Sequence, residues 1–142
     1  MAITFRYKTV TRSNGQKVRS PLIPVVLVGK ESIPTAALLD SGADVSALSK
    51  DFAEIIGLDL SGKREKCEGI GGVAECVLTT AGIIIEKGHE RYQFRIPVEV
   101  IFDDTDWGVS MLLGRAGFFD KFIISFNESE EKVSLKRVTK NN

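Results

Sequence analysis

Short runs rich in valine, isoleucine, phenylalanine and threonine divide the chain, and they constrain its fold more than any other feature. Turn-forming residues separate these runs, for example Ser13-Asn14-Gly15 and Asn127-Glu128-Ser129. This spacing is typical of a β-barrel or sandwich and not of alternating strands and helices. We therefore expect an all-β fold. The predicted strands cover residues 3–10, 22–28, 35–39, 76–85, 92–101, 122–126 and 132–138.

Local signals interrupt this pattern in a few places. Pro24 cannot donate a hydrogen bond to a neighbouring strand, so strand 22–28 should start just after it or lie at a sheet edge. A short helix is expected at 50–56, where Ser49 can cap its start and Gly57 can end it. A second helix is expected near 115–122. Residues 11–20 and the last few residues are expected to be loose.

Length and charge limit the classes of function. The 142 residues fit one domain, 1–142, and are too few for two lobes that each carry a site. The 19 basic and 19 acidic residues balance, so no overall field attracts nucleic acid or an anionic membrane. The N-terminus lacks a signal-like apolar segment, and no stretch approaches the length of a membrane span. We expect a cytoplasmic protein with no nucleic-acid or membrane partner.

The two cysteines, Cys67 and Cys76, are too few for a disulfide scaffold. No neighbouring cysteine or histidine completes a zinc-binding pattern, so we expect free thiols, no metal and no cofactor. The alternative is a disulfide between them. They flank the glycine-rich segment 69–72 and can lie on adjacent hairpin strands, in which case oxidation would control this segment.

The sequence Leu-Leu-Asp-Ser-Gly-Ala-Asp at 38–44 ends an apolar run with a carboxylate. The run can carry Asp40 into a low-dielectric cleft, Gly42 permits a tight turn behind it, and Ser41 can support the carboxylate through a hydrogen bond. This is the layout of half an aspartic-protease site, although the same residue types also form ordinary turns. The motif occurs once, because its nearest echo at 104–108 lacks a glycine directly after the hydroxyl residue. A second aspartate would have to come from another copy of the chain in a homodimer.

Two further motifs follow in order. Gly69, Ile70, Gly71 and Gly72 can form a hairpin tip that opens and closes and exposes backbone N–H groups, although a plain β-turn is the alternative. Downstream, an apolar run at 111–113 ends in a glycine and an arginine. Glycine at that place lets the strand pack against the active-site loop.

With these motifs in this order, residues 21–126 resemble the retropepsin family, the single-lobe aspartic proteases of retroviruses and their cellular and prokaryotic relatives. The resemblance implies a retropepsin-like closed β-barrel with a flap hairpin. Segment 127–142 is a strand extension beyond the viral pattern, in which the chain termini build the dimer sheet. The serine after the aspartate and the helix at 50–56 favour a cellular or prokaryotic type of member.

The resemblance also assigns roles to residues. It makes Asp40 the catalytic aspartate, with a supporting loop and a flap tip over the substrate. Asp44 and Arg115 match positions that the family joins in an ion pair behind the site, whereas an ordinary surface pair would contribute little. The loop and its support comprise Ser41, Gly42, Ala43, Asp44 and Arg115, and the flap tip comprises Gly69, Ile70, Gly71 and Gly72.

The function that follows is a homodimeric aspartic endopeptidase acting on an extended peptide or protein. Two Asp40 carboxylates, one from each chain, would activate the water that hydrolyses the peptide bond. Apolar side chains should be preferred, with Val26, Ile70, Val73, Ala74 and Leu112 as candidate lining residues. A catalytically silent dimerisation or peptide-binding module with the same fold is the alternative. A third hypothesis is a chain that works only when excised from, or joined to, a polyprotein.

Overall fold

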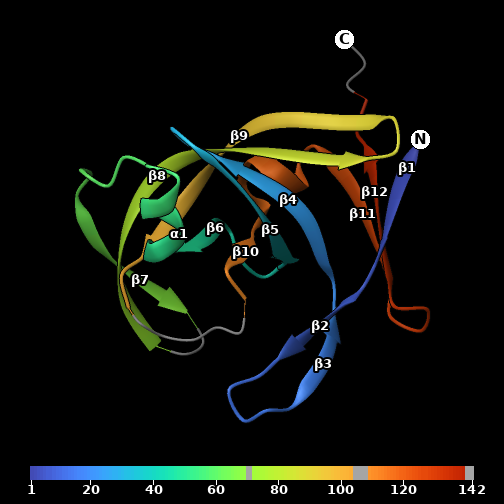
Figure 1. Cartoon of the computed structure of the whole chain (residues 1–142), viewed down its shortest axis with the longest axis horizontal. Coiled ribbons are helices and arrows are strands. Elements are labelled where there is room, and N and C mark those ends of the chain that lie inside the picture. The colour runs from blue at the N-terminus through green and yellow to red at the C-terminus, as the bar shows by residue number, and fades with distance from the viewer. Residues whose placement is uncertain (70–71, 104–108, 140–142) are drawn as a thin grey trace.

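The computed structural model describes residues 1–69, 72–103 and 109–139 (Figure 1). Most of these residues lie in strands, so the predicted all-β class is confirmed. The predictions for Ile70 and Gly71, and the motif echo at 104–108, lie outside the described residues. No helix among the described residues is long and apolar enough to cross a membrane.

The largest sheet closes on itself. Its seven strands follow the order β4-β5-β10-β6-β9-β8-β7, and β4 also pairs with β8. This additional pairing makes a ring and leaves β7 outside it, at the edge beside β8. The strands are β4 (Leu22–Val28), β5 (Ser32–Leu39), β6 (Ser46–Ser49), β7 (Arg64–Gly69), β8 (Gly72–Lys87), β9 (Glu90–Ile101) and β10 (Met111–Leu113).

Strand β10 determines where the ends of the ring strands meet. It lies between β5 and β6, parallel to β5 and antiparallel to β6. In the parallel pair Leu113 lies opposite Leu39, so the loops that follow β5 and β10 emerge side by side. The buried ends of these strands are apolar, with Leu39 5% and Leu113 0% exposed. The loop that begins at Asp40 therefore leaves from a packed, rigid base.

A second sheet joins the two ends of the chain. Its order is β1-β12-β11, formed by β1 (Ala2–Arg6), β12 (Lys132–Arg137) and β11 (Phe122–Asn127). This sheet lies at the opposite end of the molecule from β7 (Figure 1). Its inward side chains belong to the hydrophobic core, so the strand extension after residue 126 is part of the packed fold. These side chains are Ile3, Phe5, Phe122, Val133 and Leu135.

Several strand predictions need correction. Residues 11–20 are not all loose, because β2 (Lys8–Thr11) and β3 (Lys17–Ser20) pair as a hairpin. The single strand predicted at 3–10 is broken at Tyr7 between β1 and β2. The pairing of β4 with β8 starts only at Val26, so Pro24 lies in the part of β4 whose second edge has no partner among the described strands. Strands β3 and β6 were not predicted, and β7 was expected only as one side of the glycine-rich hairpin.

The helix predictions hold in part. Helix α1 (Lys50–Ile55) ends as expected at Gly57, whose φ is +70° and whose N–H donates to the Glu54 carbonyl at 3.1 Å. Ser49 lies at the start of α1, but its side chain makes no capping hydrogen bond. The second predicted helix is only an irregular turn, Arg115–Phe119, because Gly117 has a φ of +74° and interrupts it.

Candidate active site

Asp40 follows β5 directly and is half-buried. Its backbone N–H donates to the Leu113 carbonyl of β10 at 3.0 Å, which extends the parallel pairing of the two strands by one residue. Leu39 at the end of β5 and Leu113 at the end of β10 are both buried in the core. Asp40 is therefore attached to a buried part of the ring and is itself partly exposed to solvent.

The loop after Asp40 orients the carboxylate. The Gly42 N–H donates to Asp40 Oδ1 at 3.0 Å, and the Ala43 N–H donates to the Asp40 carbonyl at 3.2 Å. A Cβ on Gly42 would lie 3.3 Å from Asp40 Oδ1, a close approach that favours glycine at this position. The support comes from backbone N–H groups, whereas Ser41 is exposed and its hydroxyl makes no hydrogen bond within the described residues.

The segment after β10 holds this loop from behind. The Arg115 N–H donates to the Ala43 carbonyl at 2.9 Å, and the Ala116 N–H donates to the Asp44 carbonyl at 2.8 Å. These two bonds join the start of the irregular turn to the loop. Because they are backbone bonds, they fix the path of the loop without depending on the side chains of the residues involved.

Gly114 and Ser46 complete this support. Gly114 is buried, and a Cβ at this position would lie 2.6 Å from the carbonyl carbon and oxygen of Val45. The Gly114 N–H donates to the Ser46 Oγ at 2.9 Å, and Ser46 is fully buried. Gly114 therefore packs closely against Val45 and Ser46, as its expected role beside the active-site loop requires. The supporting role of Ser46 was not predicted.

Asp44 and Arg115 do not form the expected ion pair. Both side chains are exposed, and no salt bridge joins them in the part of the chain that the structure describes. The two residues belong to segments that are already joined by backbone hydrogen bonds, so the contact between these segments does not need the two charges.

The negative charge of Asp44 acts on the carboxyl of Glu99. Burial raises the pKa of the Glu99 carboxyl, and the nearby charges of Asp44 and Glu65 raise it further.

The predicted glycine-rich hairpin is formed by β7 and β8. Their antiparallel register runs from Arg64 opposite Val77 to Gly69 opposite Gly72. Gly72 has a φ of +122°, a conformation that glycine adopts without strain. The tip residues Ile70 and Gly71 lie outside the described residues, so the covering of a substrate by this hairpin stays a prediction.

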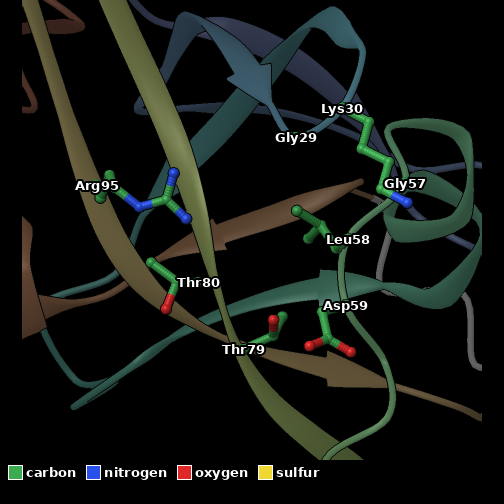
Figure 2. A pocket seen from close by; sticks show the side chains of 8 residues that line it. All are labelled: Gly29, Lys30, Gly57, Leu58, Asp59, Thr79, Thr80 and Arg95. Atoms are coloured by element: carbon green, nitrogen blue, oxygen red, sulfur yellow. The ribbon is translucent and has the colours of Figure 1, made fainter.

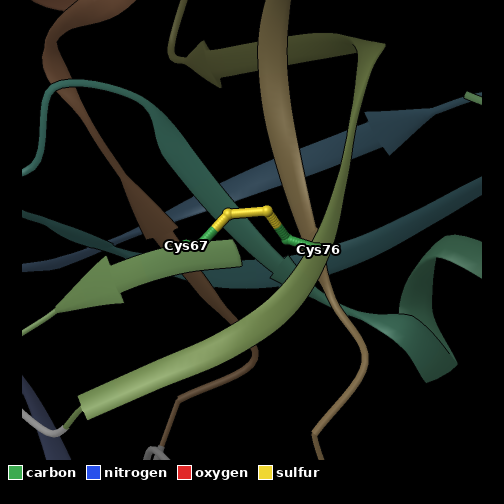
Figure 3. Close-up of a disulfide and its surroundings, with 2 residues drawn as sticks. All are labelled: Cys67 and Cys76. Atoms are coloured by element: carbon green, nitrogen blue, oxygen red, sulfur yellow. A yellow bond between two sulfur atoms is a disulfide. The ribbon is translucent and has the colours of Figure 1, made fainter. Parts of the chain in front are cut away.

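Cys67 and Cys76 are joined in a disulfide that crosses from β7 to β8, which corrects the expectation of free thiols (Figure 3). Cys67 lies opposite Ala74, and Cys76 lies two residues further along the same face of β8. The resulting Cα–Cα distance is 6.0 Å, within the range that a disulfide spans. The number of cysteines could not predict this bond, because it contains no information about the pairing of β7 with β8.

A carboxylate lies beside the disulfide. Ligand atoms of Cys67, Cys76 and Glu99 all lie within 4.8 Å of one another. Metal binding by cysteine requires thiolates, and sulfur atoms that are bonded to each other do not supply them. In the oxidised form this group therefore offers a metal ion only the Glu99 carboxylate.

A separate hollow of about 360 Å³ opens on the surface (Figure 2). Its charges are mixed, with Arg95 on one side and Lys30 and Asp59 on the other. Hydrogen bonds from Ser61 lower the pKa of Asp59. No residue of the Asp40 loop lines this hollow, so it is not the site described above. The lining residues are Gly29, Lys30, Gly57, Leu58, Asp59, Thr79, Thr80 and Arg95.

Comparison with known proteins gives likenesses of structure. No family model matches the chain, and no curated protein sequence matches it. A crystal structure of a retropepsin-like aspartic protease from Rickettsia conorii matches with a TM-score of 0.59 and 19% identity, over 95% of this chain and 92% of that chain. This likeness shows that the chain has the retropepsin fold, as the sequence motifs predicted.

Two further solved structures match less closely. EIAV protease in complex with the inhibitor HBY-793 has a TM-score of 0.43 and 25% identity, over 68% of this chain and 83% of that chain. The retroviral protease-like domain of Ddi1 from Leishmania major has a TM-score of 0.46 and 15% identity, over 87% of this chain and 99% of that chain.

Proposed function

We propose that this chain is an aspartic endopeptidase that works as a homodimer with one Asp40 from each copy. The observation that carries the proposal is the placement of Asp40. Its half-buried carboxylate follows a packed strand and accepts the Gly42 N–H in a chain with the retropepsin fold. The Asp-Ser-Gly motif occurs once, so the second carboxylate must come from a second copy related by a two-fold axis.

Two carboxylates at close range supply both an acid and a base. Like charges that share a site cannot both ionise easily, so one Asp40 keeps a proton and its partner remains a carboxylate. The carboxylate takes a proton from a water, which attacks the peptide carbonyl. The protonated member polarises that carbonyl, and a proton is then delivered to the leaving amine. No covalent intermediate forms, so no further nucleophile is needed.

The substrate class follows from the retropepsin-like arrangement, in which the β7–β8 hairpin would cover the Asp40 site. An extended peptide would then pair with the backbone of this hairpin through hydrogen bonds that do not depend on its sequence. Leu112 is half-buried and lies between Leu38 of β5 and Ala47 of β6 in the sheet register. These residues are apolar, so a preference for apolar substrate side chains is expected.

The test replaces Asp40. Asp40→Asn removes the ionisable group and keeps the shape, so cleavage of a peptide library or a denatured protein should fall by about a thousandfold or more. The oligomeric state, measured by light scattering, should not change. Asp120→Asn is the matched control, because Asp120 is an exposed aspartate outside the loop and its loss should leave cleavage within about twofold.

Two outcomes would contradict the proposal. If Asp40→Asn cleaves as fast as the unmodified chain, Asp40 is not the acid or the base. If the unmodified chain forms a dimer and binds peptides but cleaves none across acidic and neutral pH, the silent peptide-binding module is the better description. A bell-shaped dependence of kcat/KM on pH is expected for a site that needs one protonated and one ionised carboxyl.

A further inference from the structure

We propose that the Cys67–Cys76 disulfide is a redox latch, which holds β7 against β8 when oxidised and releases β7 when a dithiol reduces it. The disulfide crosses the stem of the hairpin that precedes and follows residues 70–71 (Figure 3). The consequence for catalysis rests on the proposed function, since it concerns the access of substrate to Asp40. The latch itself is a property of the fold and can be measured separately.

Strand β7 is weakly held by its own contacts. It is the last strand of its sheet and pairs with β8 alone among the described strands. Its residues from Arg64 to Glu68 are exposed except Cys67, which is half-buried. An edge strand that buries so little apolar surface depends on its backbone hydrogen bonds, and such segments open locally at low cost in free energy.

Other side-chain contacts of β7 lie at its far end. The Arg64 guanidinium lies 3.2 Å from a Glu75 carboxylate oxygen, but both side chains are more than half exposed, at 57% and 55%. Such surface pairs contribute little to stability. The same guanidinium lies 4.4 Å from the centre of the Phe102 ring. Both contacts hold the start of β7, and neither holds its end near Gly69.

The disulfide adds a covalent bond between the two strands close to the tip. Cys67 precedes Gly69 by two residues, and Cys76 is only 2% exposed and lies opposite Ile101 of β9. The bond therefore ties the end of an exposed strand to a residue anchored in the ring. A cross-link that closes a short loop removes open conformations from the accessible ensemble, whereas the reduced pair places no such limit on them.

The chemistry of release is ordinary thiol–disulfide exchange. One thiolate of a dithiol attacks a sulfur of the pair and forms a mixed disulfide, and the second thiolate then displaces the cysteine. Two electrons and two protons pass to Cys67 and Cys76, and the dithiol leaves as a cyclic disulfide. The exposed part of Cys67 gives the reductant a path to the bond. Oxidation by the reverse reaction restores the latch.

Release would change substrate binding more than the chemical step. A peptide that pairs with the hairpin would have to order a frayed β7, and that ordering opposes binding. The Asp40 loop is held by β10 and not by β7, so the catalytic carboxylate keeps its position. Reduction should therefore raise KM by about threefold or more with a smaller change in kcat.

The test compares hydrogen exchange in the oxidised and dithiothreitol-reduced protein by mass spectrometry. Amides of β7, residues 64–69, should exchange about tenfold or more faster after reduction. Amides of β12 are the internal reference, because this strand lies at the other end of the molecule and its exchange rates should not change (Figure 1).

The variant Cys67→Ser should behave like the reduced form with or without dithiothreitol. This variant alters the half-exposed cysteine and leaves the buried Cys76 in place, so folding should persist.

Each outcome decides between the possibilities. Equal exchange of β7 in both forms overturns the latch, as does an equal acceleration in β12, which would mean global loosening. If β7 opens and peptides are cleaved with an unchanged KM, redox control of substrate binding is overturned. If neither form cleaves any peptide, the proposed function fails, and the exchange of β7 still decides whether the latch exists.

Discussion

At Gly114 the backbone of one segment passes so close to Val45 that only a hydrogen atom fits between them. Its φ of −90° suits any residue, so the requirement is for space and not for an unusual conformation. A Cβ there would lie 2.6 Å from the Val45 carbonyl carbon and oxygen, neither of which can rotate away. This one contact couples the end of β10 to the loop that carries Asp40.

Gly114→Ala should therefore destabilise the protein by about 1–3 kcal/mol, the usual cost of forcing an extra carbon into a packed site. Urea unfolding followed by circular dichroism measures this loss. Cleavage should fall as well, because relief of the clash moves the segment that precedes Ser46 and follows Asp40.

Gly62→Ala is the matched control. A Cβ at Gly62 would lie 3.3 Å from Val77 Cγ1, a side-chain atom that can shift by a few tenths of an ångström. The cost should stay below about 1 kcal/mol, with no effect on cleavage. Equal losses for both variants would show that the approach to Val45 is not what constrains Gly114.

Local motifs determine how much of the site could be predicted. Asp40 and Gly42 are two residues apart, so their contact follows from a turn that can be recognised in the sequence. Ser46 accepts the N–H of a residue 68 positions later, and no local pattern indicates such a bond. The expected Asp44–Arg115 ion pair is absent among the described residues for another reason: backbone hydrogen bonds already join the two segments, so the exposed Arg115 side chain can point elsewhere.

At the scale of elements, strands with apolar sequences could be predicted and polar ones could not. The run Leu22–Val28 matches β4 at both ends, since its residues favour a strand and fill the core. The sequence of β7 is Arg-Glu-Lys-Cys-Glu-Gly, and that of β3 is Lys-Val-Arg-Ser. These segments become strands because a neighbouring strand offers a partner, which their own residues do not reveal. The disulfide depends on the register of such a pair.

Strand β12 shows that the segment after residue 126 helps to hold the fold together. It is the central strand of its sheet and pairs with β1 on one side and β11 on the other. Leu135 is 1% exposed within the core. Leu135→Ala should therefore lower the free energy of unfolding by about 2–4 kcal/mol, through lost burial and the cavity that remains. Urea unfolding gives the value.

The neighbouring residue provides the comparison. Lys136 is exposed on the same strand, so Lys136→Ala should change stability by less than about 0.5 kcal/mol. If Leu135→Ala were as mild as this control, β12 would be a surface addition and the sheet would not depend on it.

For the whole molecule, the terminal sheet restricts how two copies can meet. In the viral pattern the termini of two chains build a shared sheet, whereas here β1, β12 and β11 pair within one chain. Both edges of β12 are occupied, so a shared sheet could form only at the outer edges of β1 or β11. The proposed dimer must in addition bring two Asp40 loops together on its two-fold axis.

A mixing experiment tests this requirement on the intact molecule. Unmodified chains are mixed with Asp40→Asn chains at constant total concentration and left until subunits have exchanged. A mixed dimer has one carboxyl and one amide, so it cannot share a proton between two carboxyls, and it should be inactive.

Only dimers of two unmodified chains cleave the substrate. Random pairing makes the fraction of such dimers the square of the fraction of unmodified chains. The cleavage rate should follow that curve, whereas mixing with Asp120→Asn should leave the rate nearly constant. A rate that falls in direct proportion to the unmodified fraction would mean that each copy works alone, and the shared site at Asp40 would have to be abandoned.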